Sequence, residues 1–532
     1  MSKLFPWNPR WVSSPKLPRG HHTASERRTG LDCLGAAGAI AASLCVALLI
    51  GLGGCARNPV TGRPEAVLTS EKGEIEQGKQ AARLVQEEIG LVQDPELEAF
   101  VNALGQRLAQ HSLRAHLDYR FHVADMPEAN AFALPGGPVY VSRGLLALVN
   151  SEDELAAVLG HEIAHVEARH SVRRQAASAP LVPLRIAAAL GGAAASIVSP
   201  GLGQVVAGIG QLPGAFAMAA YSRDQEREAD KLGQELAAAA GFDPMGLAAF
   251  ATTLAREEKL EGKTMGGRSF LVSHPSSPER SSASAAYARE LTIAPDQPAP
   301  LDRYDFLRHL EGLVLGEPAA AGVFVDERFL HPELGIAFLL PSGWETLNGR
   351  RSVSAQSPDA ALNVVVEIVG KGKDAMRAAR AFGQMANLDS EARALQIHDL
   401  EAAKASTLVR APGETRQLLL VWIACDGLIY RIAGIAPLDH LAELRPDFRR
   451  TVNSFHRLSD AERREIFEDR LRLTEVRAGE TLEAVNQRSD NQWESARTAL
   501  ANGIQEESEL VPGTWLKIAR SEPYHLPARD NP

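Results

Sequence analysis

The stretch Leu159-Gly160-His161-Glu162-Ile163-Ala164-His165 decides the fold of this chain, because it sets two histidines one helical turn apart. Residues four apart on a helix lie on one face, with Cβ atoms about 5–6 Å apart. His161 and His165 can therefore both reach one zinc ion, at Zn–N distances of about 2.0–2.1 Å. Glu162 lies beside them and can act on a metal-bound water without being a ligand.

A helix over this stretch is indicated by its first residues and by its apolar spacing. Ser151 and Glu154 form a capping box. Apolar residues then recur at helical intervals up to Val166. The five-residue motif also fits two histidines on a polar surface, so the metal hypothesis depends on the rest of the chain.

A catalytic zinc needs a third protein ligand and an open position for water. One known pattern has a third histidine six residues after the second, but Ser171 stands there. The stretch 222–230 instead offers Glu226 and Asp230 one turn apart on a second helix. We expect Glu226 to bind the metal and Asp230 to accept the free ring N–H of a ligand histidine. An acidic surface helix paired with its own arginines is the alternative.

Two polar residues near these motifs are predicted to stay outside the metal site. His170 follows His165 closely in sequence but is expected off the ligand face. Glu228 is expected to be a solvated carboxylate on the second helix. The predicted site is therefore one zinc ion per chain, held by two histidines and one glutamate.

A third motif precedes these two, the stretch Asn130-Ala131-Phe132-Ala133-Leu134-Pro135-Gly136-Gly137. In this order the three motifs resemble the HtpX-type zinc metallopeptidases, family forty-eight of the metallopeptidases. That family also holds the CAAX prenyl endopeptidases and periplasmic lipoprotein members. The resemblance implies a mostly α-helical, zincin-type (gluzincin) metallopeptidase domain with a small β-sheet. It also implies an endopeptidase that acts on unfolded or misassembled envelope proteins, such as stalled outer-membrane clients.

Residues 129–142 are predicted to form a hairpin that turns at 135–138. This hairpin is either ordinary core sheet or a place for substrate. In the second case Asn130, Ala131 and Phe132 form an edge strand, against which an extended peptide lies through backbone hydrogen bonds.

A loop at 273–280 contains His274 and Arg280. Members of the family carry a similar His-Pro followed by an Arg. The resemblance implies that His274 either stabilises the oxyanion or occupies the open metal position at rest. Arg280 either holds a carboxylate or positions the loop. A turn with an exposed histidine is the simpler alternative.

Residues 1–54 are predicted to be a leader, with a basic flank and an apolar, uncharged run that ends at Leu52-Gly53-Gly54-Cys55. This ending resembles a bacterial lipobox, in which Cys55 is the lipidated first residue of the mature chain. An uncleaved membrane anchor is the alternative. We expect a periplasmic lipoprotein tethered through Cys55, and Ala56 favours the outer membrane. Only Cys425 then remains as a thiol, so no intramolecular disulfide is expected.

Two other features bear on partners. The formal net charge of −10 argues against a nucleic-acid surface, which would be basic. The stretch 186–222 carries no charged residue. It forms either apolar segments over the catalytic helices or a lid that faces membrane or client.

The chain is predicted to be multidomain. The expected parts are a tether (55–80), the zinc metallopeptidase domain (81–290), a linker (291–321) and a small accessory α+β domain (322–456). Residues 470–520 resemble a LysM module, with the order strand, helix, helix, strand. That resemblance implies peptidoglycan binding through residues 475–518, and packing or protein contact is the alternative. An envelope chaperone or assembly factor with occasional proteolysis, and a peptidoglycan-anchored scaffold, are alternative functions of the whole chain.

Overall fold

The computed structural model describes residues 55–66, 69–178, 220–261, 270–274, 278–295, 297–350, 352–386, 391–411 and 414–526. The chain divides into two compact units, Met1–Gly54 and Cys55–Pro532. The predicted leader and nearly all of the uncharged stretch 186–222 lie outside the described residues. Within those residues, every helix is too short or too polar to span a bilayer.

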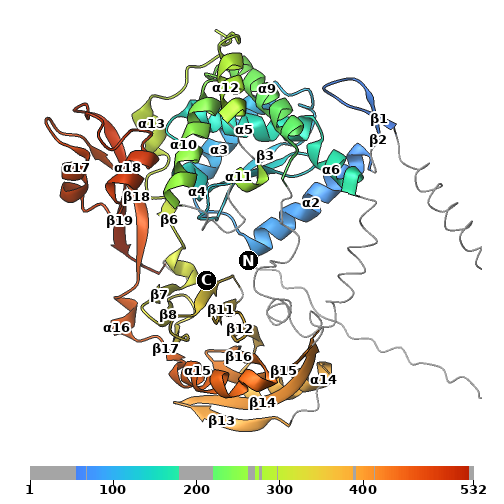
Figure 1. Ribbon diagram of the computed structural model, residues 1–532, viewed down its shortest axis with the longest axis vertical. Coiled ribbons are helices and arrows are strands. Elements are labelled where there is room, and N and C mark those ends of the chain that lie inside the picture. Colours follow the sequence, from blue (N-terminus) through green and yellow to red (C-terminus); the bar gives the residue numbers. More distant parts are fainter. Residues whose placement is uncertain are drawn as a thin grey trace, which may run out of the picture. The chain divides into compact units, whose positions relative to one another are not determined.

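The N-terminal half of the second unit is mainly helical and contains the three motifs (Figure 1). Its strands form a pair, β1–β2, and a three-stranded sheet, β3-β5-β4. The elements are β1 (Cys55–Arg57), β2 (Pro64–Ala66), α2 (Glu71–Glu88), α3 (Pro95–Ala109), β3 (Arg120–Ala124), β4 (Ala131–Ala133), β5 (Pro138–Ser142), α4 (Arg143–Leu146), α5 (Glu152–Glu167), α6 (His170–Ser178), α9 (Arg223–Ala239), α10 (Gly246–Glu261), α11 (Phe270–Ser273), α12 (Pro278–Ala288) and α13 (Arg303–Arg308).

The predicted hairpin is confirmed as β4 and β5, which pair antiparallel, while β5 pairs parallel with β3 on its other side. β4 is therefore at one edge of this sheet. Alternation along residues 119–123 also predicts a strand, and β3 lies one residue later.

The helical spacing of apolar residues predicts a helix over residues 95–115, but α3 ends at Ala109, so that prediction is too long. Past this point the chain turns, and the Ser112 hydroxyl accepts a hydrogen bond from the amide of Arg114. The Arg114 guanidinium is then buried and donates to Glu74 and to the carbonyl of Val166. A helix that continued through this turn would leave the buried Glu74 without its ion pair to Arg114. The helix therefore ends early, although the apolar spacing continues.

α5 and α9 approach each other at two glycines. A Cβ on Gly160 would lie 2.8 Å from the carbonyl oxygen of Gly233, and a Cβ on Gly233 would lie 2.7 Å from the amide nitrogen of His161. The two helices therefore touch backbone to backbone. Ser151 accepts from the Glu154 amide as predicted, but the Glu154 carboxylate accepts from the amide of Asn150 and not from that of Ser151, so only half of the predicted capping box forms. The spacing of Ser222 and Gln225 also predicts a capping box, and that one is complete.

An apolar cluster surrounds α5 and holds it in place. Its members come from α3, the small sheet, α5, α9 and α10, and also from beyond the predicted peptidase domain. Phe306, Leu307 and Leu310 are fully buried in it. Part of the segment predicted to be a linker, 291–321, therefore packs in this core, because its apolar residues recur at helical spacing around α13.

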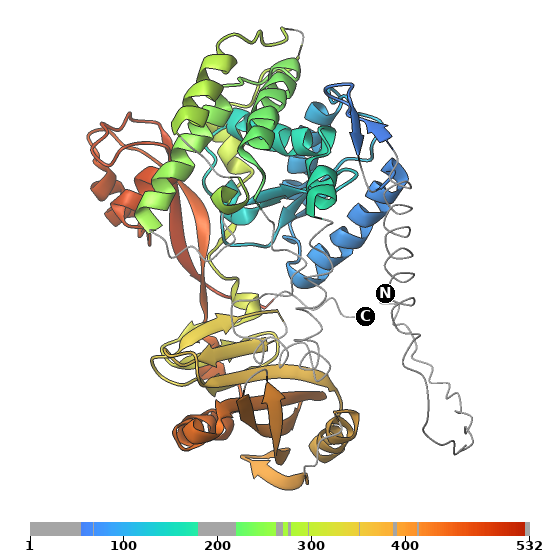
Figure 2. The same ribbon diagram turned by 45° about the vertical axis from the view of Figure 1, so that its right-hand side comes forward.

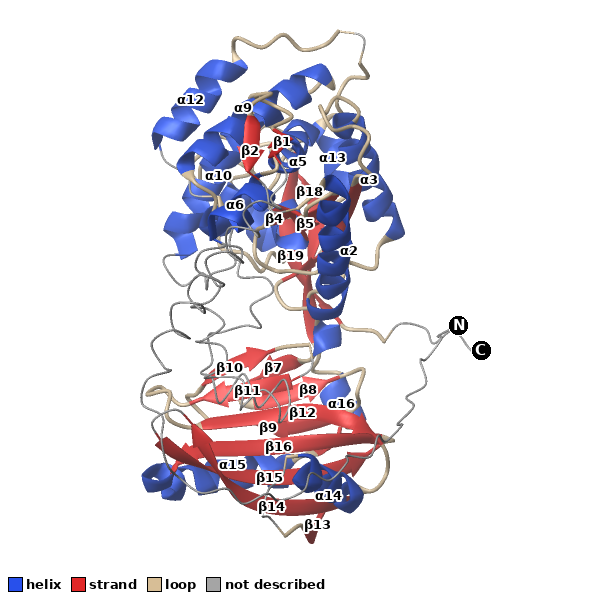
Figure 3. Cartoon of the chain, turned by 90° about the vertical axis from the view of Figure 1, so that its right-hand side faces the viewer, coloured by secondary structure: helices blue, strands red, loops and turns tan. Residues whose placement is uncertain are grey.

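The C-terminal region is rich in β-sheet (Figure 3). A seven-stranded sheet has the order β10-β11-β12-β16-β15-β14-β13, and a four-stranded sheet has the order β17-β9-β8-β7. The bounds are β7 (Val323–Val325), β8 (Arg328–His331), β9 (Ile336–Leu339), β10 (Glu345–Asn348), β11 (Ser352–Gln356), β12 (Asn363–Lys371), α14 (Ala375–Met385), β13 (Arg393–Ile397), β14 (Leu400–Ala411), β15 (Glu414–Cys425), β16 (Leu428–Pro437), α15 (Leu441–Ser454) and β17 (His456–Arg457).

Successive side chains of β12 point to opposite faces of the seven-stranded sheet, and α14 and α15 pack on opposite faces. Val364 packs with α15 and with the four-stranded sheet, whereas Val365 packs with α14. The sequence of this domain predicts one helix at about residues 373–387, and α14 confirms it. Cys425 is the last residue of β15 and is a buried free thiol, as predicted.

Four elements follow in the order strand, helix, helix, strand: β18 (Phe467–Glu475), α17 (Leu482–Ser489), α18 (Ser495–Ala501) and β19 (Trp515–Pro523). A short strand, β6 (Val314–Leu315), pairs with β18. The segment from β18 to β19 has the orange-red and red colours in Figure 2. Lys517 on β19 is fully buried, and its Nζ donates to the carbonyls of Ala147 and Val149 at 2.8 and 2.7 Å. These two carbonyls lie just before the start of α5.

The glycine contact generates a prediction about stability. Gly233→Ala should lower the free energy of unfolding by about 1–3 kcal/mol, because the added methyl meets backbone atoms that can move only with their helices. Urea denaturation of the full chain measures this. The matched control is Gly370→Ala, where nothing lies within 4 Å of the added Cβ. A similar change in the free energy of unfolding of both variants would show that the close α5–α9 contact does not determine the effect of Gly233→Ala.

Candidate metal centre

The His-Glu-x-x-His motif lies in the interior and not on a polar surface. His161 and Glu162 have no exposed area, and His165 is 2% exposed. The Nε2 atoms of His161 and His165 lie 3.0 Å apart, so both rings present the same nitrogen to one point. This convergence follows from their spacing of one turn on α5.

α9 brings a carboxylate to the same point. Glu226 Oε2 lies 3.6 Å from His161 Nε2, and Oε1 lies 3.5 Å from His165 Nε2. His274, directly after α11, places its Nδ1 3.1 Å from Glu226 Oε1 and 3.2 Å from His161 Nε2. One donor atom from each of the four residues lies within 4.8 Å of the others. The structure thus brings together the three predicted ligands and adds His274.

This donor set fits one zinc ion. Neutral imidazoles and a carboxylate are ligands that zinc prefers in proteins. Both carboxylate oxygens of Glu162 are buried, and within the described part of the chain neither has a hydrogen-bond partner. His274 Nε2 lies 3.4 Å from Glu162 Oε1, so an imidazole stands beside this carboxylate. Burial raises the pKa of Glu162 above its ordinary value.

Asp230 and Arg280 form the second layer around the donors. Asp230 Oδ1 lies 3.0 Å from His161 Nδ1, the ring nitrogen that faces away from the other donors. Arg280 donates to Asp230, and one of its nitrogens lies 2.7 Å from Glu226. Burial alone would raise the pKa of Asp230, but hydrogen bonds from Arg280 and His161 outweigh it and hold that pKa well below its usual value. Arg280 therefore contacts two carboxylates of α9.

The expectation that Glu228 is a solvated carboxylate is wrong. Its Oε2 lies 2.9 Å from His170 Nε2 and 3.2 Å from Arg173, and its side chain is 24% exposed. His170 is off the face of the donor cluster, as predicted, yet its Nδ1 lies 2.8 Å from His165 Nδ1. The reason is local: Arg169 adopts a left-handed φ of 55°, which ends α5 and folds the next residue back.

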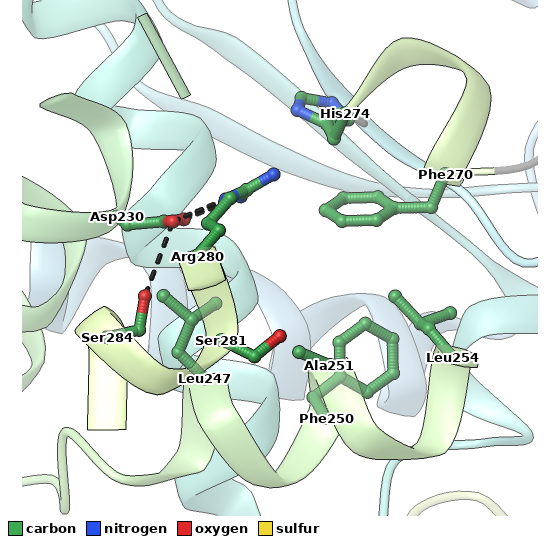
Figure 4. A pocket seen from close by; sticks show the side chains of 10 residues that line it. All are labelled: Asp230, Leu247, Phe250, Ala251, Leu254, Phe270, His274, Arg280, Ser281 and Ser284. Atoms are coloured by element: carbon green, nitrogen blue, oxygen red, sulfur yellow. Dashed lines mark hydrogen bonds and ion pairs between the residues drawn. The ribbon is translucent and has the colours of Figure 1, made fainter. Parts of the chain in front are cut away.

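Aromatic rings support two of the imidazoles, and the sequence analysis did not identify either. Tyr221 stacks on His165 with ring centroids 3.9 Å apart, and Phe270 stacks on His274 at 4.3 Å. Tyr221 lies just before α9, and Phe270 is the first residue of α11. Their places at helix starts are the only feature of the sequence that could have indicated this role. Figure 4 shows a pocket beside His274, lined by Asp230, Leu247, Phe250, Ala251, Leu254, Phe270, Arg280, Ser281 and Ser284.

The predicted substrate strand lies close to this cluster. β4 contacts α5, and among the described strands it pairs only with β5. Asn130, Ala131 and Phe132 are buried, and Phe132 stacks on Tyr140 with ring centroids 4.9 Å apart. The side chains of this motif thus serve the core, and the backbone of the strand is what it can offer to a peptide.

Comparison with known proteins places this site in a class. The model of Peptidase family M48 matches residues 95–287, which contain every residue of the cluster. The matched residues are similar to an M48 peptidase domain, and the donor set described above fits the zinc ion that peptidases of that family use.

Several curated relatives match part of this chain. The "Beta-barrel assembly-enhancing protease" of Yersinia pestis is 31% identical over 278 residues, 52% of this chain and 54% of that protein. Its Escherichia coli K12 counterpart is 31% identical over 207 residues, 38% of this chain and 41% of that protein. "Mitochondrial metalloendopeptidase OMA1" of Schizosaccharomyces pombe is 36% identical over 181 residues, 34% of this chain and 50% of that protein. The chain thus spans about half the length of these relatives.

The site geometry predicts which carboxylate of α9 holds the metal. Loss of a residue that only hydrogen-bonds to a metal ligand usually lowers metal affinity by about 10–100-fold. Glu226→Ala should lower zinc affinity by more than this, because it removes a ligand. Elemental analysis after dialysis against a graded chelator measures the zinc that is retained. Asp224→Ala on the same helix is the control, because that side chain is 92% exposed. Zinc retention equal to wild type in Glu226→Ala would exclude Glu226 as a ligand.

Proposed function

We propose that this chain is a zinc-dependent metalloendopeptidase of the bacterial cell envelope. The observation that supports this most directly is the convergence of His161, His165 and Glu226, with the buried carboxylate of Glu162 on the same helix as the two histidines. In this assignment His161, His165 and Glu226 hold the zinc ion. Asp230 accepts a hydrogen bond from His161, and Arg280 neutralises the two carboxylates of α9.

The chemistry follows from the residues around the metal position. A bound zinc ion supplies Lewis acidity, which polarises the scissile carbonyl and makes the attacking water more acidic. Glu162 accepts the proton of that water as its oxygen bonds to the carbonyl carbon. Glu162 then donates the proton to the leaving amine as the C–N bond breaks. The backbone of β4, around Asn130, Ala131 and Phe132, binds the peptide in an extended form.

The proposed substrates are misfolded or stalled outer-membrane proteins. Support comes from the relatives named as beta-barrel assembly-enhancing proteases and from the leader sequence before Cys55. In this proposal Cys55 is lipidated and tethers the enzyme at the periplasmic face of the outer membrane. The β18-α17-α18-β19 order supports a LysM-like module that binds peptidoglycan through residues 475–518.

A second candidate function is an envelope chaperone or assembly factor with occasional proteolysis. The observation that favours it is His274, which is 1% exposed and lies among the donor atoms where a substrate carbonyl or water has to enter. An enzyme held in this state binds clients more often than it cleaves them. A scaffold anchored to peptidoglycan is a third candidate, and it needs no cleavage at all.

The catalytic proposal is tested by Glu162→Gln. This variant should retain zinc and fold but lose cleavage of an unfolded protein, because all three ligands remain while the base does not. Gel analysis of casein digestion by the full chain, with and without chelator, gives the rate. Glu87→Gln, an exposed residue of α2, is the control. Equal specific activity in wild type and Glu162→Gln would contradict the mechanism.

The role of His274 is tested by His274→Ala. If His274 occupies the open metal position at rest, cleavage of the unfolded substrate and self-cleavage should both rise, since the position becomes free. If it instead stabilises the oxyanion, kcat should fall by about 10²-fold with zinc retained. The contacts at 3.1 and 3.2 Å to Glu226 and His161 favour the first outcome. Unchanged turnover and zinc content would exclude both roles.

A further inference from the structure

The two histidines of the motif have different partners behind them. Each presents Nε2 to the donor cluster, so its Nδ1 faces outward. His161 Nδ1 faces a carboxylate, Asp230, at 3.0 Å. His165 Nδ1 faces a second imidazole, His170, at 2.8 Å. The orientation of His165 is therefore not controlled in the usual way, by a carboxylate or a carbonyl.

The proton positions between these rings are set from the far end, by Glu228. A carboxylate can only accept hydrogen bonds, so the hydrogen between Glu228 Oε2 and His170 Nε2, 2.9 Å apart, is on the histidine. In a neutral ring the other nitrogen, Nδ1, then has a lone pair and accepts from His165 Nδ1–H. His165 is thereby left with its Nε2 lone pair directed at the donor cluster.

The fold fixes this arrangement from several sides. The left-handed turn at Arg169 sets the position of His170, and the Arg169 side chain is anchored by a 3.0 Å bond to the buried Glu74 of α2. Glu228 is also held by Arg173 at 3.2 Å. Tyr221 covers the face of the His165 ring. His170 itself has no exposed area, so water cannot replace its hydrogen bond to His165.

We propose that His170 is a positioning residue of the metal site, and that Glu228 holds His170 in the tautomer that orients His165. This inference rests on the proposed role of His165 as a zinc ligand. His170 and Glu228 do not touch the metal or the substrate. They act by keeping one tautomer and one ring orientation of His165, which raises the affinity of the site.

The test compares two substitutions of His170 by zinc affinity, measured by competition with a chromophoric chelator on the full chain. His170→Phe keeps a buried ring but removes the acceptor, so zinc affinity should fall by about 10–100-fold. His170→Gln offers an amide oxygen to His165 Nδ1–H and should recover most of that loss. The visible spectrum of the cobalt-substituted protein should change in His170→Phe and resemble wild type in His170→Gln.

Glu228→Gln tests the hydrogen bond between His170 and Glu228. It also tests the proposal if His170→Phe does not fold. The amide can donate to His170 Nε2, which permits the opposite tautomer, so zinc affinity should fall with Tm unchanged. Arg227→Met on the same helix is the control, because that side chain is 62% exposed and pairs with Asp224. Zinc affinity like wild type in folded His170→Phe and Glu228→Gln, or equal losses in His170→Phe and His170→Gln, would overturn the proposal. Because zinc binding is measured without substrate, a chain that binds zinc and cleaves nothing fails the proposed function alone.

Discussion

The close contact of Gly160 and Gly233 is the constraint on which the rest of the site depends. With no side chain at either position, α5 and α9 meet backbone to backbone. That contact fixes how far α9 can slide or rotate against α5. Glu226 precedes Gly233 by two helical turns and therefore faces the same helix as the glycine does. The carboxylate reaches His161 and His165 because two glycines let the helices meet.

This arrangement places two carboxylates in the interior, and a nearby arginine neutralises their negative charge. Glu226 and Asp230 are both buried on α9, one turn apart, which would be unfavourable if nothing neutralised them. Arg280 from α12 contacts both. The arginine is thus tied to α9, while His274, from the preceding α11, lies over the donors. The charge balance of the site depends on a segment far along the chain from the motif.

The sequence was sufficient where the signal is local. One-turn spacing predicted His161, His165, Glu226 and Asp230 as facing pairs, and hydroxyl side chains predicted both helix starts. It was insufficient where tertiary structure decides. His170 and Glu228 meet only because Arg169 turns left-handed, and α3 stops short because Arg114 finds a buried partner. The long strand β14 is rich in alanine, so its sequence gave no strong strand signal.

The boundary of the peptidase core is also a tertiary matter. The three motifs end at residue 230 and the loop with His274 ends at residue 280, but the apolar cluster around α5 includes Leu471 of β18. Lys517 of β19 satisfies two carbonyls at the start of α5, and Arg303 bonds both Asn150 and Asn502 across the same junction. Burial of a lysine is unfavourable unless its ammonium group donates hydrogen bonds to acceptors such as these carbonyls. The strands of the C-terminal region therefore help to hold the catalytic helix, so a fragment cut at the end of the motifs would leave those acceptors unsatisfied.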